Sequence, residues 1–328
     1  MLNVYFNGTA AAASFGATPG TAPLNYLQIY APDILYAEAH VNAPAQVVET
    51  SGASVSVSAQ DLLNLAIVKL LQIGEPLPSI TPGGIVPPQI NAGGVVNNAS
   101  YGQSSSVAPG SIAALFGTNL TDGTSCLPLA CNPTFTNGKL GTTMAGAQVT
   151  VNGTPVPIFY AAPVQLGIQI PFEVTGTSAI VSVSIAGQAS TPGTITLAPV
   201  AAGIFTATSD GKGAGAITHV NGSAVTTQNP AQPGELVILY VTGLGQVTPA
   251  VATGALPAGL SKTVAPVTVT IGGINVSPLD FFAGLAGCCV GLNQINAHVP
   301  AGISSGNAVP VVLSIGGKSS NTATIAVQ

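Results

Sequence analysis

Two short patterns in this 328-residue chain resemble sites that perform chemistry elsewhere. Residues 302–306 (GISSG) match the Gly-x-Ser-x-Gly pattern of a nucleophilic serine, which needs a strand-turn-helix context and a later acid and histidine. Here a strand-like segment follows Ser304, and no His, Asp or Glu comes after it. Residues 210–213 (DGKG) resemble a phosphate loop but lack its Gly-x₄-Gly-Lys-Ser/Thr spacing and the helix that would hold an anion. We interpret both patterns as turns and predict no enzymatic activity.

The remaining polar residues do not predict a metal or cofactor site. The three histidines, His40, His219 and His298, fall in different predicted units of the chain. The ten acidic residues are scattered, whereas a calcium site needs clustered carboxylates. The cysteines lack the paired spacing of a zinc site. We therefore predict no metal and no cofactor.

The chain is poor in charge. It has five lysines, no arginine and ten acidic residues, so that charged residues make up 5% of it and the net charge is −5. A nucleic-acid-binding protein needs a basic surface, and so few lysines cannot form one. The composition therefore excludes nucleic-acid binding. Weak net charge gives weak repulsion between copies and favours self-association. The chain contains no apolar run of 18 residues, so no transmembrane segment is predicted. Residues 1–6 lack the features of a signal peptide.

The four cysteines form two local pairs. Cys126 and Cys131 enclose a short loop that contains a proline, and a disulfide between them would pin this loop. Cys288 and Cys289 are adjacent and would form either a vicinal bridge or bonds to another copy. Such pairs in a chain rich in Ser and Thr favour an oxidising compartment outside the cytoplasm. Four buried free thiols are the alternative.

The last two thirds of the chain contain one pattern twice. Any functional residues in this part of the chain are therefore held by two copies of the same fold. Four segments return in the same order while the loops between them change length, which indicates two copies of one domain. The matching segments are 109–117 with 233–243, 148–153 with 267–273, 165–171 with 293–300, and 184–190 with 314–320.

Each copy has the pattern of an all-β domain. Short strand-like runs alternate with Gly, Pro, Asn and Ser turns, and no helical period is present. A domain of this length with about seven short strands fits an immunoglobulin-like (Ig-like) sandwich. We predict a mainly β protein with Ig-like domains at residues 95–200 and 201–328. The short apolar junction at 198–205 predicts that the two domains are held rigidly end to end.

Residues 1–80 do not match the repeat and predict a smaller β-rich domain with one helix at 59–73. Ser58 can cap this helix, and Gly74 followed by Pro76 ends it. More than half of the helix circumference is apolar, so the helix packs either within its own domain or at a subunit interface. Residues 81–94, rich in Pro and Gly, are predicted to be a linker.

The start of the chain predicts a strand. Leu2, Val4 and Phe6 alternate with polar residues and precede the small residues 9–14. A terminal strand on such a tether can pair with the open sheet edge of a neighbouring subunit, where these three side chains would fill pockets. The alternative is that the strand completes its own N-terminal domain.

A set of motifs in the second repeat resembles a known family. The motifs occur in family order at residues 203–207 (GIFTA), 210–213 (DGKG), 232–235 (QPGE), 241–245 (VTGLG), 283–285 (AGL) and 291–296 (GLNQIN). They are similar to the uncharacterised C-terminal Ig-like family of secreted Acidobacteria (Solibacter-type) proteins. Residues 95–200 match more loosely, and residues 287–289 (GCC) depart from the family pattern. Segments such as 109–117 also resemble the IPT/TIG class of Ig folds.

The resemblance implies a secreted or cell-surface Ig-like module and brings no catalytic residue. Together with the weak charge and the rigid junction, it predicts a non-enzymatic extracellular structural protein, a subunit that assembles with other copies into a surface filament or layer. Few lysines protect the strand edges against such pairing. The alternative is a secreted adhesion or glycan-binding module whose partners are surface glycans.

The cysteine pairs give a direct test. We expect Cys126 and Cys131 to be linked by a disulfide, and Cys288 and Cys289 to be oxidised, because local pairs close readily in an oxidising compartment. Mass mapping of the protein under non-reducing conditions measures this. Four free thiols would refute the disulfides and weaken the extracellular assignment.

Overall fold

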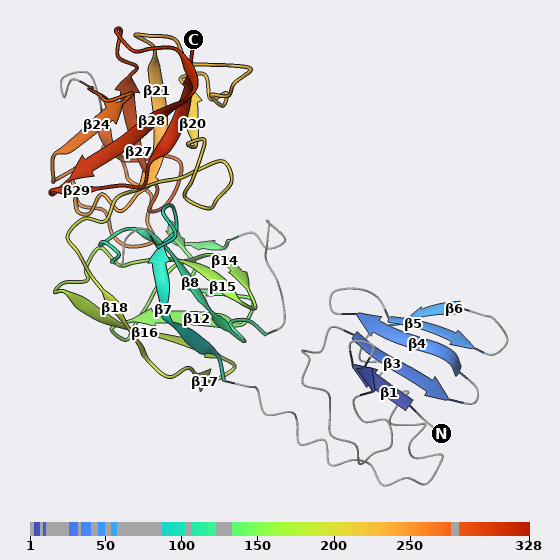
Figure 1. Cartoon of the computed structure of the whole chain (residues 1–328). Helices are drawn as coiled ribbons and strands as arrows, with labels where there is room; N and C mark the ends of the chain where they lie inside the picture. Colours follow the sequence, from blue (N-terminus) through green and yellow to red (C-terminus); the bar gives the residue numbers. More distant parts are fainter. Residues whose placement is uncertain are drawn as a thin grey trace. The chain divides into compact units, whose positions relative to one another are not determined.

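A computed structural model divides the chain into two compact units, Met1–Ile85 and Val86–Gln328. In the first unit the structure describes six strands, and in the second it describes residues 87–102, 106–122, 133–276 and 282–328. All regular elements among these residues are strands, and each sheet is antiparallel (Figure 1). The chain is thus a mainly β protein, as the sequence predicts. The predicted helix at 59–73 lies outside the described residues.

The first unit contains one six-stranded sheet in the order β2-β1-β3-β4-β5-β6. Its strands are β1 (Asn3–Phe6), β2 (Thr9–Ala10), β3 (Tyr26–Ala31), β4 (Ile34–His40), β5 (Ala45–Glu49) and β6 (Ser54–Val57). β1 pairs with β3 along its whole length and with β2 at its end, where Phe6 lies opposite Leu27 and Thr9.

This pairing bears on the predicted assembly strand. Val4 and Phe6 lie in β1, whereas Leu2 lies outside the described residues. β1 pairs with β3 along its whole length and with β2 at Tyr5 and Phe6, a pairing that agrees with a strand that completes its own domain. Strand exchange by residues 2–6 stays a prediction.

The first repeat folds into an Ig-like sandwich. One sheet has the order β14-β15-β8-β7, and the other has β12 and β16 at its centre. The strands are β7 (Gln89–Asn97), β8 (Ile112–Thr118), β11 (Thr143–Met144), β12 (Ala147–Val151), β13 (Thr154–Pro155), β14 (Ile158–Ala162), β15 (Gln165–Gln169), β16 (Ser178–Ile185), β17 (Gln188–Ala189) and β18 (Gly193–Thr196), with a small hairpin of β9 (Phe135–Thr136) and β10 (Lys139–Leu140) beside them.

The second repeat forms a second Ig-like sandwich. Its strands are β19 (Gly203–Ile204), β20 (Ile217–His219), β21 (Leu236–Thr242), β22 (Val247–Thr248), β23 (Lys262–Thr263), β24 (Val267–Ile271), β25 (Ile274–Asn275), β26 (Phe282–Leu285), β27 (Asn293–His298), β28 (Gly306–Ile315), β29 (Lys318–Ser319) and β30 (Ala323–Val327). One sheet is built around β21 and β27, and the other around β24 and β28. Figure 1 shows the second sandwich stacked on one end of the first.

The alternation of the strands and the chemistry of the turns explain both sandwiches. In β16 every second side chain is buried, including Val181 and Val183, so one face of the strand joins the core. The hairpin between β12 and β13 turns through Asn152 and Gly153, both with positive φ. Asn-Gly is the favoured pair for such a two-residue turn. Residues 272–273 (GG) make the same turn in the second repeat.

The boundary of the first sandwich differs from the sequence prediction. β7 begins at Gln89, inside the segment expected to be a linker at 81–94. Residues 91–94 form a bulge opposite β8, because the register shifts between Ile90 and Val95. Most side chains in this half of β7 are exposed. The segment thus lacks the alternation that would identify a strand, and its conformation comes from pairing with β8.

Candidate functional site: the junction of the two sandwiches

The junction between the two sandwiches is the most elaborate arrangement of buried polar groups among the described residues. It has two contact regions. One surrounds the connecting residues 198–202, and the other is made by residues 246–256, which reach from the second sandwich to the first. Buried polar groups are costly unless they are bonded, so each such bond fixes the geometry of its partners.

Asn97 fastens the connecting segment from the side of the first sandwich. It lies at the end of β7 and is fully buried. Its Nδ2 donates to the carbonyl of Ala201 at 2.7 Å, while its Oδ1 accepts from the backbone N–H groups of Ala99 and Ser100 at 2.8 and 3.1 Å. One side chain thereby joins the β7 turn to a segment that lies 104 residues later in the chain.

The second sandwich holds the same segment from the other side. The backbone N–H of Ala201 donates to the carbonyl of Gly243 at 2.8 Å. Gly243 has φ of +82°, and a side chain there would place its Cβ 2.0 Å from the oxygen of Ala201. The position therefore admits only glycine. Next to it, the buried hydroxyl of Thr242 accepts from the backbone N–H of Ile112 at 2.8 Å, which links β21 directly to β8.

In the second contact region, residues 253–254 dock on the first sandwich. The N–H of Gly254 donates to Oε1 of the buried Gln169 at 2.7 Å, and the N–H of Leu140 donates to the carbonyl of Gly254 at 2.8 Å. The hydroxyl of Thr253 accepts from the N–H of Phe172 at 2.8 Å. These bonds connect the loop to two different strands of the first sandwich, so the loop resists rotation as well as separation.

A small apolar cluster lies between these polar contacts. Phe172 of the first sandwich packs with Val247 and Leu285 of the second, and Val251 covers them. Gln246 closes one side, because its Nε2 donates to the carbonyl of Phe172 at 2.6 Å. Burial of an apolar side chain contributes about 1.5–3 kcal/mol relative to its exposure. The cluster therefore supplies attraction, whereas the hydrogen bonds set the orientation.

Glu173 adds an ionisable group to the junction. Its carboxylate accepts hydrogen bonds from the hydroxyl and the backbone N–H of Thr253. Desolvation by burial opposes the ionisation of Glu173, but the bonds from Thr253 outweigh it and lower the pKa of this carboxyl. The charged form of Glu173 is the one that holds the loop, so this contact is present above the carboxyl's ordinary pKa and is lost as the pH falls through the lowered value.

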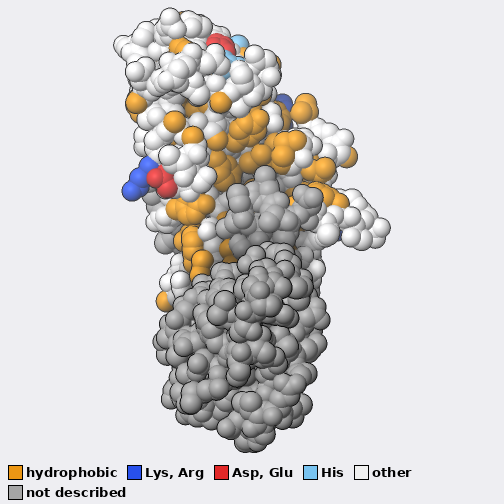
Figure 2. All heavy atoms as spheres, turned by 90° about the vertical axis from the view of Figure 1, so that its right-hand side faces the viewer, with side chains coloured by type: hydrophobic (Ala, Val, Ile, Leu, Met, Phe, Trp, Pro, Cys, Tyr) orange, Lys and Arg blue, Asp and Glu red, His pale blue; other side chains and the backbone are white. Residues whose placement is uncertain are grey.

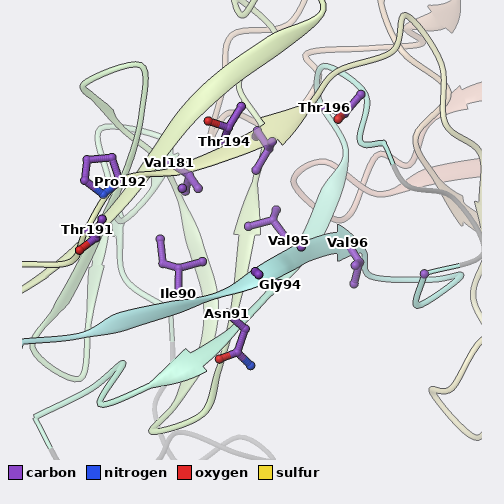
Figure 3. Close-up of a pocket in the computed structure, with 15 residues that line it drawn as sticks. Ile90, Asn91, Gly94, Val95, Val96, Val181, Thr191, Pro192, Thr194 and Thr196 are labelled. Atoms are coloured by element: carbon purple, nitrogen blue, oxygen red, sulfur yellow. The ribbon is translucent and has the colours of Figure 1, made fainter.

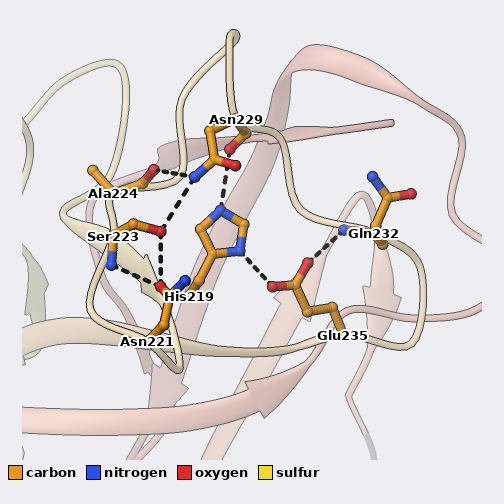
Figure 4. A network of polar contacts seen from close by, with 7 residues as sticks. All are labelled: His219, Asn221, Ser223, Ala224, Asn229, Gln232 and Glu235. Carbon is orange, nitrogen blue, oxygen red and sulfur yellow. Dashed lines mark hydrogen bonds and ion pairs between the residues drawn. The ribbon is translucent and has the colours of Figure 1, made fainter.

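A second polar network braces the long loop that follows β20 (Figure 4). Nδ1 of His219 contacts the carboxylate of Glu235, and Nε2 of His219 lies 3.1 Å from the carbonyl of Asn229. The hydrogen bond to Glu235 raises the pKa of His219, against a smaller effect of desolvation. Desolvation raises the pKa of Glu235, but His219 and the N–H of Gln232 outweigh it and lower this pKa. The pair thus joins the start of the loop at His219 to its end at Glu235.

The residues that the sequence analysis considered lie apart from one another. The sulfur atoms of Cys288 and Cys289 are bonded in an exposed turn after β26, whereas Cys126 and Cys131 lie outside the described residues. Asp210 accepts from Thr208 and from the N–H of Lys212 in a local turn. Within the described part of the chain, no three His, Cys, Asp or Glu side chains group in a way that could hold a metal ion. The oxidation state of the cysteines in solution stays a prediction.

Sequence reasoning missed the buried amides that build the junction. Asn97 and Gln169 stand in strands whose other inward residues are apolar, and a buried amide in such a place needs partners. Asn321, just before β30, is a further buried amide within the second sandwich: its Oδ1 accepts from the N–H of Ile204 at 2.8 Å, and its Nδ2 donates to the carbonyls of Ile204 and Gly211. The position of an amide in an apolar pattern is the signal that was present, but it does not reveal the partner.

No protein-family model matches the chain. No curated protein sequence matches it either. Among solved structures, it is similar to SGBP-B of the Bacteroides ovatus mixed-linkage glucan utilization locus in complex with a mixed-linkage heptasaccharide, at 13% identity and a TM-score of 0.31 over 100% of this chain and 60% of that one. The chain thus spans about three fifths of the length of that protein.

Two further likenesses are to a titin tandem, at 10% identity and a TM-score of 0.20 over 100% of this chain and 88% of that one, and to domains 4–9 of the surface layer protein SbsC, at 11% identity and a TM-score of 0.24 over 99% of this chain and 38% of that one. With TM-scores below 0.5, these likenesses carry no argument about function. The resemblance to the Acidobacteria family stays a prediction.

Removal of the Asn97 side chain should loosen the junction. In Asn97→Ala the carbonyl of Ala201 and the N–H groups of Ala99 and Ser100 lose their partner while they stay buried, which destabilises the fold by about 2–3 kcal/mol. Denaturant unfolding measures the change, and protease cleavage within residues 198–203 should become faster. Asn91→Ala, an exposed amide on the same strand, is the control and should change stability by less than about 0.5 kcal/mol. Equal stability of the two variants would contradict the role of Asn97.

The loop between β20 and β21 should be most protected at mildly acidic pH. The raised pKa of His219 gives stability that is present below about pH 6.5 and is lost as the pH rises through the raised value. The lowered pKa of Glu235 gives stability that is lost only in acid. Hydrogen exchange of residues 220–234, corrected for intrinsic rates, should therefore show local protection fall by about 1 kcal/mol from pH 5.5 to 9.

His219→Gln is the control for this effect, because it removes the titrating group and keeps a polar side chain. An unchanged pH dependence in that variant would show that another group controls the loop.

Proposed function

We propose that this chain is a non-enzymatic structural protein of the extracellular surface, a subunit that assembles with other copies into a filament or layer. The observation that carries the proposal is the junction. Polar bonds and an apolar cluster on two sides join the sandwiches, and residues 86–328 form one compact unit. A subunit that transmits force or keeps a lattice spacing needs such fixed geometry, whereas flexible linkers allow domains to reorient.

The surface supports association between copies. Figure 2 shows one face on which hydrophobic side chains are spread over the described part, with few charged ones among them. The exposed large hydrophobic residues include Leu260 and Val264, at 74% and 64% exposure, close to the junction in sequence. Net charge is only −5 over 328 residues, so copies repel one another weakly. Exposed apolar surface with little charge is typical of interaction surfaces.

The edges of the sheets also support association between copies. Strand edges in monomeric proteins are usually blocked by lysines or other devices, and this chain has five lysines for its two sandwiches and a further sheet. Non-closing contacts between copies of a rigid subunit produce fibres or sheets rather than closed rings. No described helix is long and apolar enough to cross a membrane.

Electron microscopy of the purified protein tests this function. We expect ordered polymers or layers that form as the concentration rises. Particles that stay single at all concentrations, together with binding on a glycan array, would instead support the alternative of a secreted adhesion or glycan-binding module. The Asn97→Ala variant is a matched comparison, because a loosened junction should give polymers with poorer order.

A further inference from the structure

A groove in the first sandwich lies between the edges of its two sheets. It has a volume of about 580 Å³ and is lined by residues 90–96 of β7 and residues 191–196 around β18, together with Val181. Figure 3 shows Ile90 and Val95 pointing from β7 towards the strand that carries Thr194, while Asn91 and Val96 point the other way. Ile90 and Val95 pack against the core of the sandwich, so the groove has an apolar floor.

The backbone of Thr194 faces this groove. In β18 the carbonyl of Thr196 accepts from the N–H of Val107, a bond on the edge of the strand that faces away from β16. Backbone groups two residues apart point to the same side of a strand, so the N–H and carbonyl of Thr194 also face outward. No described residue is bonded to them. Because β18 pairs with β16 on its other side, this edge can accept one more strand.

The second repeat shows what belongs at such an edge. Thr324 of β30 corresponds to Thr194, and there the edge is covered. The N–H of Thr324 donates to the carbonyl of Gly213 at 2.8 Å, and the N–H of Gly215 donates to the carbonyl of Thr324 at 2.8 Å, which creates a parallel bridge with Ala214. A Cβ at the buried Gly215 would lie 3.0 Å from Ile217 and 3.4 Å from Ala323, so the space beside this residue is tight.

The difference between the repeats is an insertion. Residues 205–230 connect β19 to the segment before β21, and they supply the covering strand. The equivalent connection in the first repeat, residues 98–106, is much shorter. Val107 covers the edge beside Leu197, as Ala231 covers it beside Val327, but nothing described corresponds to Gly213–Gly215. Among the described residues, the first sandwich therefore has the site for a covering strand without the strand itself.

We propose that this groove binds an extended, small-residue segment of a second copy of the chain, which pairs in parallel with β18 at Thr194. The inference rests on the assembly proposed above and names the place of contact. The new strand would continue the pairing that Val107 already makes with the same edge. The described residues of the lining carry no charge, so the groove favours an uncharged partner.

A second copy is such a partner. Residues 76–121 and 174–209 of the chain carry no charged side chain, so a segment from these ranges would enter the groove without desolvating a charge. Backbone hydrogen bonds give the affinity of an added strand, and its alternate side chains give the specificity.

Substitution of Thr194 tests the proposal in the full-length protein. Thr194→Pro removes the outward N–H and places a ring at the edge, which an edge strand tolerates because this N–H does not bond to β16. Thr194→Lys adds a charge at the same edge. Thr154→Lys, at an exposed position on β13 of the same sandwich, is the matched control. Circular dichroism checks that each variant is folded.

Sedimentation velocity over a concentration series should show that both Thr194 variants associate at least about tenfold more weakly than the wild type, while Thr154→Lys associates normally. In addition, a photo-reactive residue at position 194 should crosslink to a second copy, and peptide mapping should find an uncharged segment. Normal assembly of folded Thr194→Pro and Thr194→Lys, or crosslinks only within the same chain, would overturn this contact and leave the assembly function standing. A wild-type chain that stays monomeric would overturn both.

Discussion

The geometry of the second unit depends on buried side-chain amides that bond to backbone groups of distant segments. Asn97 and Asn321 each satisfy both a donor and an acceptor requirement from one position, and Gln169 reaches the loop of the other sandwich. An amide without partners in these places would destabilise the fold, so each segment it contacts has one favourable position. The apolar core alone would leave the domains free to slide, because apolar contacts are not directional.

This constraint explains how a chain with so few charges fixes the orientation of its domains. Inter-domain contacts in many proteins use salt bridges, and this chain replaces them at the junction with neutral hydrogen bonds around Phe172 and its cluster. Glu173 is the ionised exception, and its partner is the neutral Thr253. Neutral bonds are insensitive to ionic strength, so the junction should keep its geometry in salt.

The two repeats show how one architecture gives different surfaces. Their cores and hairpins correspond closely, but the loop after the first strand differs in length, and this loop decides whether the edge at Thr194 or Thr324 is covered. The second sandwich closes its own edge and uses the His219–Glu235 pair to hold the inserted loop. In the first sandwich no described residue covers the corresponding edge. A sheet edge is a general template for pairing, so the length of this loop bears on which contacts the edge can make.

The sequence by itself determined the repeat and the mainly β class, because alternating burial and Gly or Asn turns are local consequences of side-chain type. Val181 and Val183 in β16, and Asn152 with Gly153 in the turn after β12, follow from their immediate neighbours. The tertiary structure decided the rest. Residues 89–94 form a strand only because β8 lies beside them, although their exposed side chains resemble a linker. The partner of Asn97 lies 104 residues away, and that of Gln169 lies 85 residues away. Local patterns carry no information about such distances, since the bond depends on which backbone groups the packed sheets bring together.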